Sequence, residues 1–533
     1  MQKREKETWI NQNKKNKLIE ILCVFLITLL IVCFLIKFQL SYVTIEDEQI
    51  IKYSALNFNN YTDLVKYDQL NNKYTTCIFS KLSSLIDEKN YPSISSSEAI
   101  FFLPFSIILG KNFLLILNNI FVILITLLVY LITKKFTKSI LSATTTSIVF
   151  ILSPIFLKWS LGFFNIIPAL FFFLLTTYFL FIYKKRFKYF FVGLSFLGLL
   201  MIRPGEFLFI IPIIVVGHLR NAKSKDFLLL FYLMFFLFLT ILIANNEMFG
   251  GFFNFPQLYI HNLPCLQNNF TTTSYFTIPI ESIDYLYSNT LFFILNFSFA
   301  FPVMWVAIFF GICLYKRKKE FIIFSLLILI VLLAIYGRYT GYGYSQENLQ
   351  SSFTRHFIYL FSLLSINIGL FIKAFRTKFN NIQSETIFAI STCIIILLIL
   401  NTYSYLGNGI EVYNEKKSNQ HNITIDLLEK INPTDLVITD VNTNKLIPIE
   451  SGIVQLQFDK AAARIDYNTT SKEFKRVLSN LVEDNQSISV LVQRQTNYTE
   501  DLITYLNNNY TLSKQGSYIK GIIELYKIRG KNL

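Results

Sequence analysis

The chain has 533 residues, of which 53% are hydrophobic and only 16% charged, and its formal net charge is +15. Soluble domains contain about 25% charged residues, so the composition excludes an ordinary soluble protein, and it also excludes disordered, collagen-like and disulfide-rich secreted chains. A basic excess in such an apolar chain indicates either nucleic-acid binding or the topology of a membrane protein.

Apolar segments recur along most of the chain, and a membrane-spanning helix needs about 20 such residues. The sequence predicts a polytopic α-helical membrane protein of about eleven transmembrane helices. These helices are expected over residues 18–40, 113–133, 140–157, 161–183, 189–203, 205–219, 227–244, 290–315, 321–336, 357–372 and 384–401. Residues 99–110 are apolar but short and contain Pro104, which predicts an interfacial or re-entrant helix instead of a span.

Lysine and arginine gather on alternate sides of the predicted helices. The tail at residues 1–17 and the five loops after even-numbered helices carry 23 of them, whereas the loop at 245–289 has none. This positive-inside pattern predicts a multi-pass protein of the plasma membrane with a cytoplasmic N-terminus. The basic clusters are short and dispersed and lack a recognition fold, so nucleic acid is not an expected partner.

Three parts follow from this topology: a cytoplasmic tail (1–17), a transmembrane module (18–401) with a large first outer loop (41–98), and an extracytoplasmic domain (402–533). Within the last part, residues 424–431 are typical of a helix. Strands are expected over residues 435–440, 488–493 and 517–528. Alternating helices and strands indicate a small α/β domain.

The first outer loop begins with acidic residues. Glu46, Asp47 and Glu48 directly follow the first predicted span and open a helix-like run, DEQIIKYSALNF. Carboxylates at a membrane–water boundary suit a reaction between a lipid substrate and an aqueous one. Their place in a first helical turn also has a purely structural explanation, because the helix dipole favours acids there.

This arrangement resembles the Asp-Glu motif of the GT-C membrane glycosyltransferases, which include protein O-mannosyltransferases and lipid A aminoarabinose transferases. Further elements are similar in order and place. They are Tyr91-Pro92 followed by FFLPFSIILGKN, the turn at residues 152–168, the Arg-Pro element MIRPGE at residues 201–206, and the SSFTRHF element at residues 351–357.

The resemblance implies a sugar donor carried on polyprenyl phosphate and an extracytoplasmic acceptor that is a glycan, lipid or protein. It implies Asp47 as the general base, Glu48 as its catalytic neighbour, and Glu46 and Tyr91 as residues of the substrate loop. Guanidinium groups bind phosphate in a bidentate manner. Arg355, Arg203 and Arg338 are therefore candidates to hold the donor phosphate.

Several alternatives stay open from the sequence. Glu206 could simply neutralise Arg203, and His356 is expected to be a satisfied interfacial histidine. A transporter or flippase of lipid-linked sugars, or a glycan polymerase or ligase that uses lipid diphosphate, would share the membrane character. The sequence contains no metal-binding motif, and it leaves the need for a divalent cation or another cofactor unknown.

Overall fold

The structure is a computed structural model of the chain. The described residues are 2–38, 55, 83–86, 89–92, 96–110, 113–161, 165–184, 187–220, 222–249, 319–336, 356–378, 419, 422–439, 443, 446–447, 453–457, 467–493, 497–518 and 521–531. The chain divides into two compact units. One comprises residues 1–41, 114–239 and 277–412, and the other comprises residues 42–113, 240–276 and 413–533.

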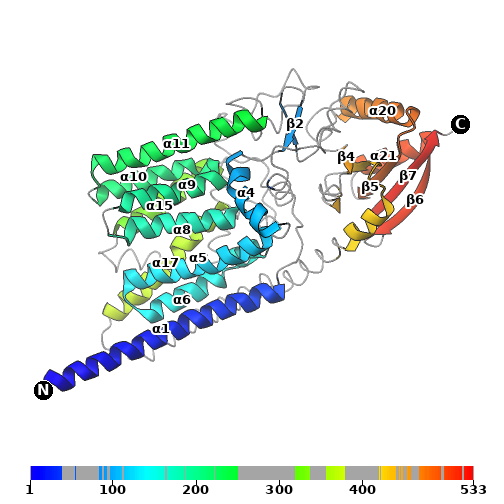
Figure 1. Ribbon diagram of the computed structural model, residues 1–533. Helices are drawn as coiled ribbons and strands as arrows, with labels where there is room; N and C mark the ends of the chain where they lie inside the picture. Colours follow the sequence, from blue (N-terminus) through cyan, green and yellow to red (C-terminus); the bar gives the residue numbers. More distant parts are fainter. Residues whose placement is uncertain are drawn as a thin grey trace. The chain divides into compact units, whose positions relative to one another are not determined.

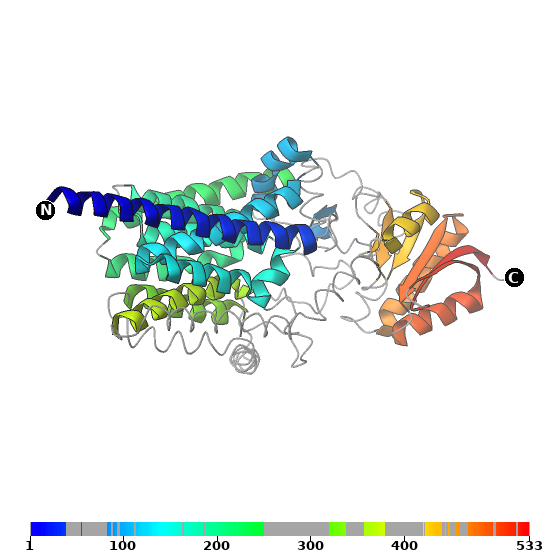
Figure 2. The ribbon, with the colours of Figure 1, turned by 90° about the horizontal axis from the view of Figure 1, so that it is seen from below.

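The first unit consists of apolar helices that lie side by side (Figures 1 and 2). Its described elements are α1 (Gln2–Phe38), α5 (Phe113–Thr137), α6 (Ile140–Ile151), α7 (Pro154–Ser160), α8 (Ile166–Phe181), α9 (Lys188–Ile202), the 3-10 helix η2 (Pro204–Phe209), α10 (Ile210–Leu219), α11 (Ser224–Phe249, up to residue 239), α15 (Lys319–Tyr336) and α17 (Ile358–Lys378). They coincide with nine of the predicted segments. The predicted spans 290–315 and 384–401 lie outside the described residues.

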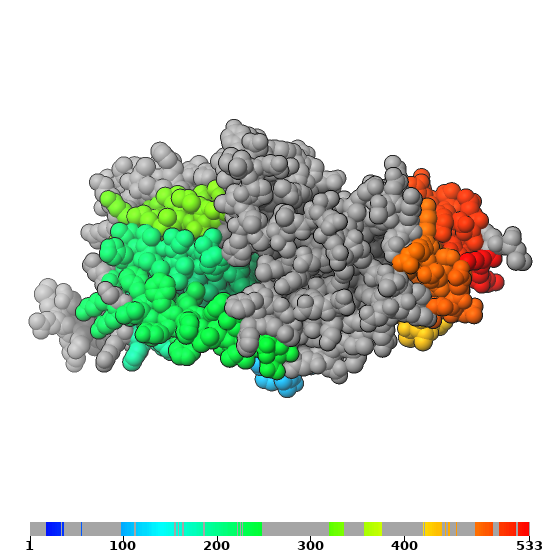
Figure 3. Space-filling model, turned by 90° about the horizontal axis from the view of Figure 1, so that it is seen from above, coloured from blue at the N-terminus to red at the C-terminus, as the bar shows by residue number. Residues whose placement is uncertain are grey.

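Three of the described helices are long and apolar enough to cross a membrane: Phe113–Thr137, Phe227–Glu247 and Ile358–Phe375. Of these, α11 exposes the most apolar surface, and its green side chains cover part of the face in Figure 3. The exposed side chains include Phe231, Tyr232, Phe235 and Phe236. A contiguous apolar and aromatic surface of this kind suits contact with lipid.

Two helix boundaries differ from the sequence prediction. The first helix begins at Gln2, so the helix continues through the segment expected to be only a tail. The segment 140–157 is divided into α6 and α7, because Pro154 lacks the backbone N–H that a continuous helix needs. Ser153 caps the new helix, its hydroxyl accepting a hydrogen bond from the backbone N–H of Phe156 at 3.4 Å.

Aromatic contacts bring the basic ends of several helices together. The ring of Phe321, at the start of α15, lies 5.0 Å from that of Phe136 in α5 and 5.3 Å from that of Phe181 in α8. The guanidinium of Arg220, directly after α10, lies 5.3 Å from the ring centroid of Phe181. Lys134 of α5 also forms an ion pair with Glu20 of α1. The basic residues therefore gather at one end of this unit.

The second unit contains a hairpin, a short helix and the C-terminal α/β domain. Strands β1 (Ser83–Ile86) and β2 (Lys89–Pro92) pair in antiparallel fashion. Helix α4 (Ser96–Leu109) includes the segment predicted to be a short apolar helix. Ser106 of α4 donates a hydrogen bond to the backbone carbonyl of Ala55 at 2.9 Å, which ties Ala55 to this helix.

The C-terminal domain has a five-stranded sheet of order β4-β3-β5-β7-β6. Its strands are β3 (Leu436–Thr439), β4 (Val454–Gln457), β5 (Ile488–Gln493), β6 (Tyr510–Tyr518) and β7 (Ile523–Lys531). Strand β3 pairs in parallel with β4 and with β5, and β7 pairs in antiparallel fashion with β5 and with β6.

Both faces of this sheet are covered by helices. Side chains of α20 (Tyr467–Glu483) and α21 (Asn497–Asn509) pack on one face with Ile438 and Val490. The helix at residues 422–430 packs on the other face with Val437. Alternate residues of β3 thus enter opposite cores, as the two-residue period of a strand requires, and the predicted α/β layering is confirmed.

One strand prediction is wrong. The segment 517–528 was expected to be a single strand, but the structure divides it between β6 and β7. Gly521 has a φ of +86°, and its N–H donates to the carbonyl of Tyr518 at 3.2 Å. A glycine adopts this left-handed conformation without strain, so the chain reverses here and forms a hairpin.

Candidate functional site

Arg203 lies at a break between two helices. Helix α9 ends at Ile202, and Arg203 has φ −138° and ψ 81°, outside the helical region. The following Pro204 disfavours a helical conformation in the residue before it and begins η2. The sequence Arg-Pro therefore ends one helix, starts another, and leaves the arginine side chain at the junction.

Three described residues contact the guanidinium of Arg203, one at each nitrogen. Its Nε donates to Glu206 Oε1 at 3.0 Å, and its Nη1 donates to Asn165 Oδ1 at 3.0 Å. Its Nη2 lies 2.8 Å from Nδ1 of His356. These three contacts fix both the position and the plane of the guanidinium.

The contacts join segments that are distant in sequence. Asn165 directly precedes α8, Glu206 lies in η2, and His356 lies two residues before α17. We call these residues, with Arg203, the Arg203 cluster. The cluster lies at the start of α8 and just before α10, whereas Phe181 and Arg220 lie at the other ends of these two helices. It is therefore at the end of the unit away from the basic residues.

Glu206 and His356 of the Arg203 cluster are buried, Asn165 and Arg203 are partly buried, and one of the four residues is a carboxylate. The Glu206 side chain is 0% exposed and that of Arg203 11% exposed. Asn165 offers a neutral amide oxygen. Because an arginine nitrogen only donates, His356 accepts through Nδ1 as a neutral ring with its proton on Nε2. Among these three described partners, Glu206 offsets the positive charge of Arg203, while the other two residues orient it.

The structure describes some of the predicted site residues and not others. The predicted alternative that Glu206 pairs with Arg203 is confirmed. Tyr91 lies in β2, opposite Ser84 of β1. The remaining predicted site residues, Glu46, Asp47, Glu48, Arg338 and Arg355, lie outside the described residues.

Sequence reasoning missed the part that Asn165 plays and gave His356 no role beyond a satisfied interfacial position. His356 does have a hydrogen-bonding partner, but that partner is Arg203. The sequence holds one signal for Asn165, because this polar residue separates two apolar runs. No local signal for its pairing exists, because Arg203 follows 38 residues later.

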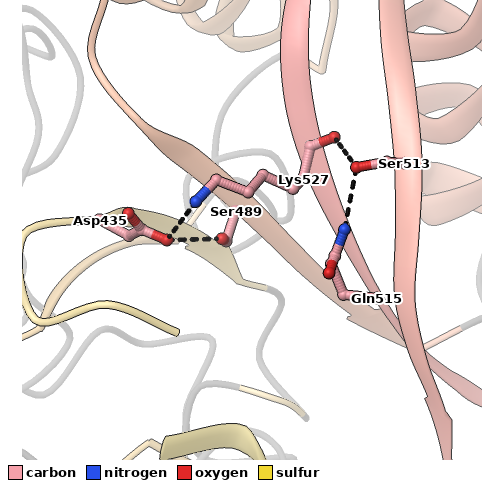
Figure 4. Close-up of polar contacts among 5 residues, drawn as sticks. All are labelled: Asp435, Ser489, Ser513, Gln515 and Lys527. Carbon is pink, nitrogen blue, oxygen red and sulfur yellow. Dashed lines mark hydrogen bonds and ion pairs between the residues drawn. The ribbon is translucent and has the colours of Figure 1, made fainter. Parts of the chain in front are cut away.

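A second polar cluster, of which Asp435 and Ser489 are buried, lies in the C-terminal domain (Figure 4). The carboxylate of Asp435, whose side chain is 1% exposed, accepts a hydrogen bond from Ser489 at 3.2 Å and contacts Lys527 Nζ at 3.4 Å. Ser513 donates to the carbonyl of Lys527 at 3.4 Å and accepts from Gln515 at 2.9 Å. These contacts link β3, β5, β7 and β6, which indicates a role in holding the sheet.

No group of three or more metal-ligating side chains is present in the described part of the chain. The chemistry available to the Arg203 cluster is that of an oriented cation, which suits an anionic oxygen such as a phosphate.

Known proteins resemble this chain in fold and not in sequence. No protein-family model matches the chain, and no curated protein matches it in sequence. Its fold, however, is that of the GT-C membrane glycosyltransferases, which confirms the resemblance seen in the sequence.

Similar solved structures include two of ArnT, a lipid A aminoarabinose transferase, from Cupriavidus metallidurans. The apo structure has a TM-score of 0.55 at 9% identity and covers 95% of this chain and 97% of that chain. The structure bound to undecaprenyl phosphate has a TM-score of 0.51 at 11% identity, with the same coverage of 95% and 97%. At these identities the likeness shows a shared fold.

Proposed function

We propose that the protein is a membrane glycosyltransferase that moves a sugar from a polyprenyl-phosphate donor to an acceptor hydroxyl on the extracytoplasmic face. The observation that carries the proposal is the Arg203 cluster, a partly buried and oriented cation at the end of the helical unit away from the basic residues. The shared fold supports it, since one structure with that fold binds undecaprenyl phosphate.

The phosphate of such a donor carries a negative charge that grows when the bond to the sugar breaks. Arg203 supplies one cation, but the Glu206 carboxylate, whose Oε1 lies 3.0 Å from Arg203 Nε, offsets much of its positive charge. We assign the additional positive charge to Arg355, which directly precedes His356 in the sequence, and to Arg338. Guanidinium groups are suited to this work because they remain protonated and bind phosphate oxygens in pairs.

Asp47 acts as the general base in this proposal. Its carboxylate takes the proton of the acceptor hydroxyl while the acceptor oxygen forms a bond to the anomeric carbon of the sugar. The bond between that carbon and the phosphate oxygen breaks, and polyprenyl phosphate leaves with the electron pair. Glu48 tunes Asp47 through like-charge repulsion or positions the acceptor, and we assign Glu46 and Tyr91 to the substrate loop.

Substitution of Asp47 tests this assignment. Asp47→Asn keeps the size of the side chain but removes the base, so transfer from a polyprenyl-phosphate sugar should fall by about 10²–10⁴-fold. Asp63→Asn, a matched change elsewhere in the same loop, should leave transfer near the wild-type rate. Both variants are compared by formation of the glycosidic product in liposomes that contain the purified protein. Wild-type transfer by Asp47→Asn would exclude Asp47 as the base.

A further inference from the structure

Two cations from different helices meet at the basic end of the helical unit. Arg220 directly follows α10, and its guanidinium lies 5.3 Å from the ring centroid of Phe181 in α8. The ring of Phe321 lies 5.3 Å from the same Phe181 ring, and Phe321 comes two residues after Lys319, the first residue of α15. Arg220 and Phe321 thus contact one ring, which brings Arg220 close to the first turn of α15.

The contact with Phe181 positions Arg220 without cancelling its charge. The face of an aromatic ring attracts a cation but is itself uncharged. Arg220 is half-buried and Lys319 is exposed. The first turn of α15 also holds Glu320, an acid that the positive end of the helix dipole stabilises there. The guanidinium of Arg220 and the ammonium of Lys319 are both suited to donate hydrogen bonds to a phosphate.

From Lys319 onward, α15 presents a stripe of exposed apolar side chains. Ile323, Leu326 and Ile330 are all exposed, and they follow Lys319 at the three- and four-residue intervals that keep side chains on one face of a helix. Residues between them, such as Phe324 and Ile328, are buried inside the unit. One face of α15 therefore joins a cation at the helix end to an apolar surface.

Helix α10 repeats this arrangement beside α15, against which it packs (Figure 1). Its exposed apolar side chains are Ile211, Val215 and Leu219, again at intervals that place them on one face. This stripe ends at Arg220. Two neighbouring helices thus each carry a cation at the basic end and an exposed apolar stripe that leads away from it.

We propose that the ends of α10 and α15 bind an anionic phospholipid. Arg220 and Lys319 hold the phosphate of its headgroup, and its acyl chains lie along the two apolar stripes. The charge of the pair is complementary to such a headgroup, and the exposed stripes suit acyl chains better than water. The proposal goes beyond the sugar transfer proposed above and requires only that the chain lies in a membrane.

Quenching of a tryptophan placed in the α15 stripe tests this proposal. The full-length protein carrying Ile323→Trp is reconstituted in phosphatidylcholine vesicles, and phosphatidylglycerol with brominated acyl chains is added in increasing mole fraction. The signal of the three native tryptophans is subtracted with the unsubstituted protein. We expect half-quenching at a mole fraction at least about fivefold lower than with brominated phosphatidylcholine, because each basic residue contributes about fivefold to the binding of anionic lipid.

Charge variants in the same background distinguish a lipid site from a general surface potential. Arg220→Gln and Lys319→Gln should each raise the half-quenching mole fraction of phosphatidylglycerol about fivefold, whereas Arg220→Lys should keep it within about twofold. The control is Lys225→Gln, which removes an exposed basic residue of α11, outside the α10–α15 pair, and should change the value by less than about twofold. Because Lys319 is exposed, its variant tests the site even if Arg220→Gln is unstable.

Three results would overturn the proposal. The first is equal quenching by the two brominated lipids at equal mole fraction. The second is an equal effect of Lys225→Gln and Lys319→Gln, because it would reduce the binding to a general attraction by all the basic residues. The third is relief of quenching by an equal concentration of glycerol phosphate, which has the phosphate without the acyl chains. None of these measurements includes a sugar donor, so their outcome is separate from that of the proposed function.

Discussion

At the scale of single residues, the buried pair of Arg203 and Glu206 has two explanations that mutation can separate. Arg203→Leu alone leaves the Glu206 carboxylate buried without its cation and should destabilise the protein by about 3–5 kcal/mol. Arg203→Leu with Glu206→Leu removes both charges and should restore most of that stability, because replacing a buried pair with apolar side chains is often neutral.

Activity then distinguishes a structural pair from a phosphate ligand. We expect the double variant to melt near the wild-type temperature and yet to lose sugar transfer, because the donor phosphate lacks the Arg203 contact. Thermal denaturation and product formation are measured on the same preparation. A stable double variant that transfers sugar at the wild-type rate would restrict Arg203 to a structural role.

In the C-terminal domain, Asp426 gives a pH-dependent prediction. Hydrogen bonds from Lys430 and from the hydroxyl of Tyr518 hold the pKa of Asp426 below its ordinary value. A lowered pKa in the folded state stabilises the protein above the unfolded pKa of about 3.9, and this stabilisation is lost as the pH falls through the folded value. Asp426→Asn should therefore lower the melting temperature at pH 7, and the difference from wild type should shrink below about pH 4.

At the scale of helices, Gly369 of α17 lies at a close contact with α5 and α6. A Cβ atom at this position would lie 2.4 Å from Thr133 Cγ2 of α5 and 2.4 Å from Thr146 Oγ1 of α6. Gly369→Ala should therefore destabilise the protein by about 1–3 kcal/mol, despite the better helix propensity of alanine. Gly205→Ala is the control, since nothing lies within 4 Å of a Cβ atom there. Equal melting temperatures for the two variants would contradict this packing.

Elements were easier to predict than the contacts between them. Apolar runs predicted the described helices because burial in lipid or protein needs a length that the sequence displays directly. The breaks before α7 and between β6 and β7 depend on Pro154 and Gly521, single residues inside longer apolar segments whose overall composition does not reveal the break. The pairing of Arg203 with His356, 153 residues away, has no local signal, since tertiary packing alone brings the two together.

At the scale of the whole molecule, the charge of +15 has a definite location. Residues 402–533 carry 15 basic and 15 acidic residues, so the excess lies entirely in residues 1–401. Within the helical unit, the contacts around Phe321 gather basic helix ends, and the Arg203 cluster lies at the opposite end. This separation supports the predicted topology, in which the basic end faces the cytoplasm and the cluster faces outward.

The central claim is tested most directly by supplying the purified protein with sugar donors on polyprenyl monophosphate and on polyprenyl diphosphate, together with envelope acceptors. We predict that the monophosphate donors are consumed, with stoichiometric appearance of polyprenyl phosphate and of a new glycosidic product by mass spectrometry. Consumption of the diphosphate donors alone would identify a polymerase or ligase. Movement of either donor across a sealed membrane without a new glycosidic bond would identify a transporter and contradict this account.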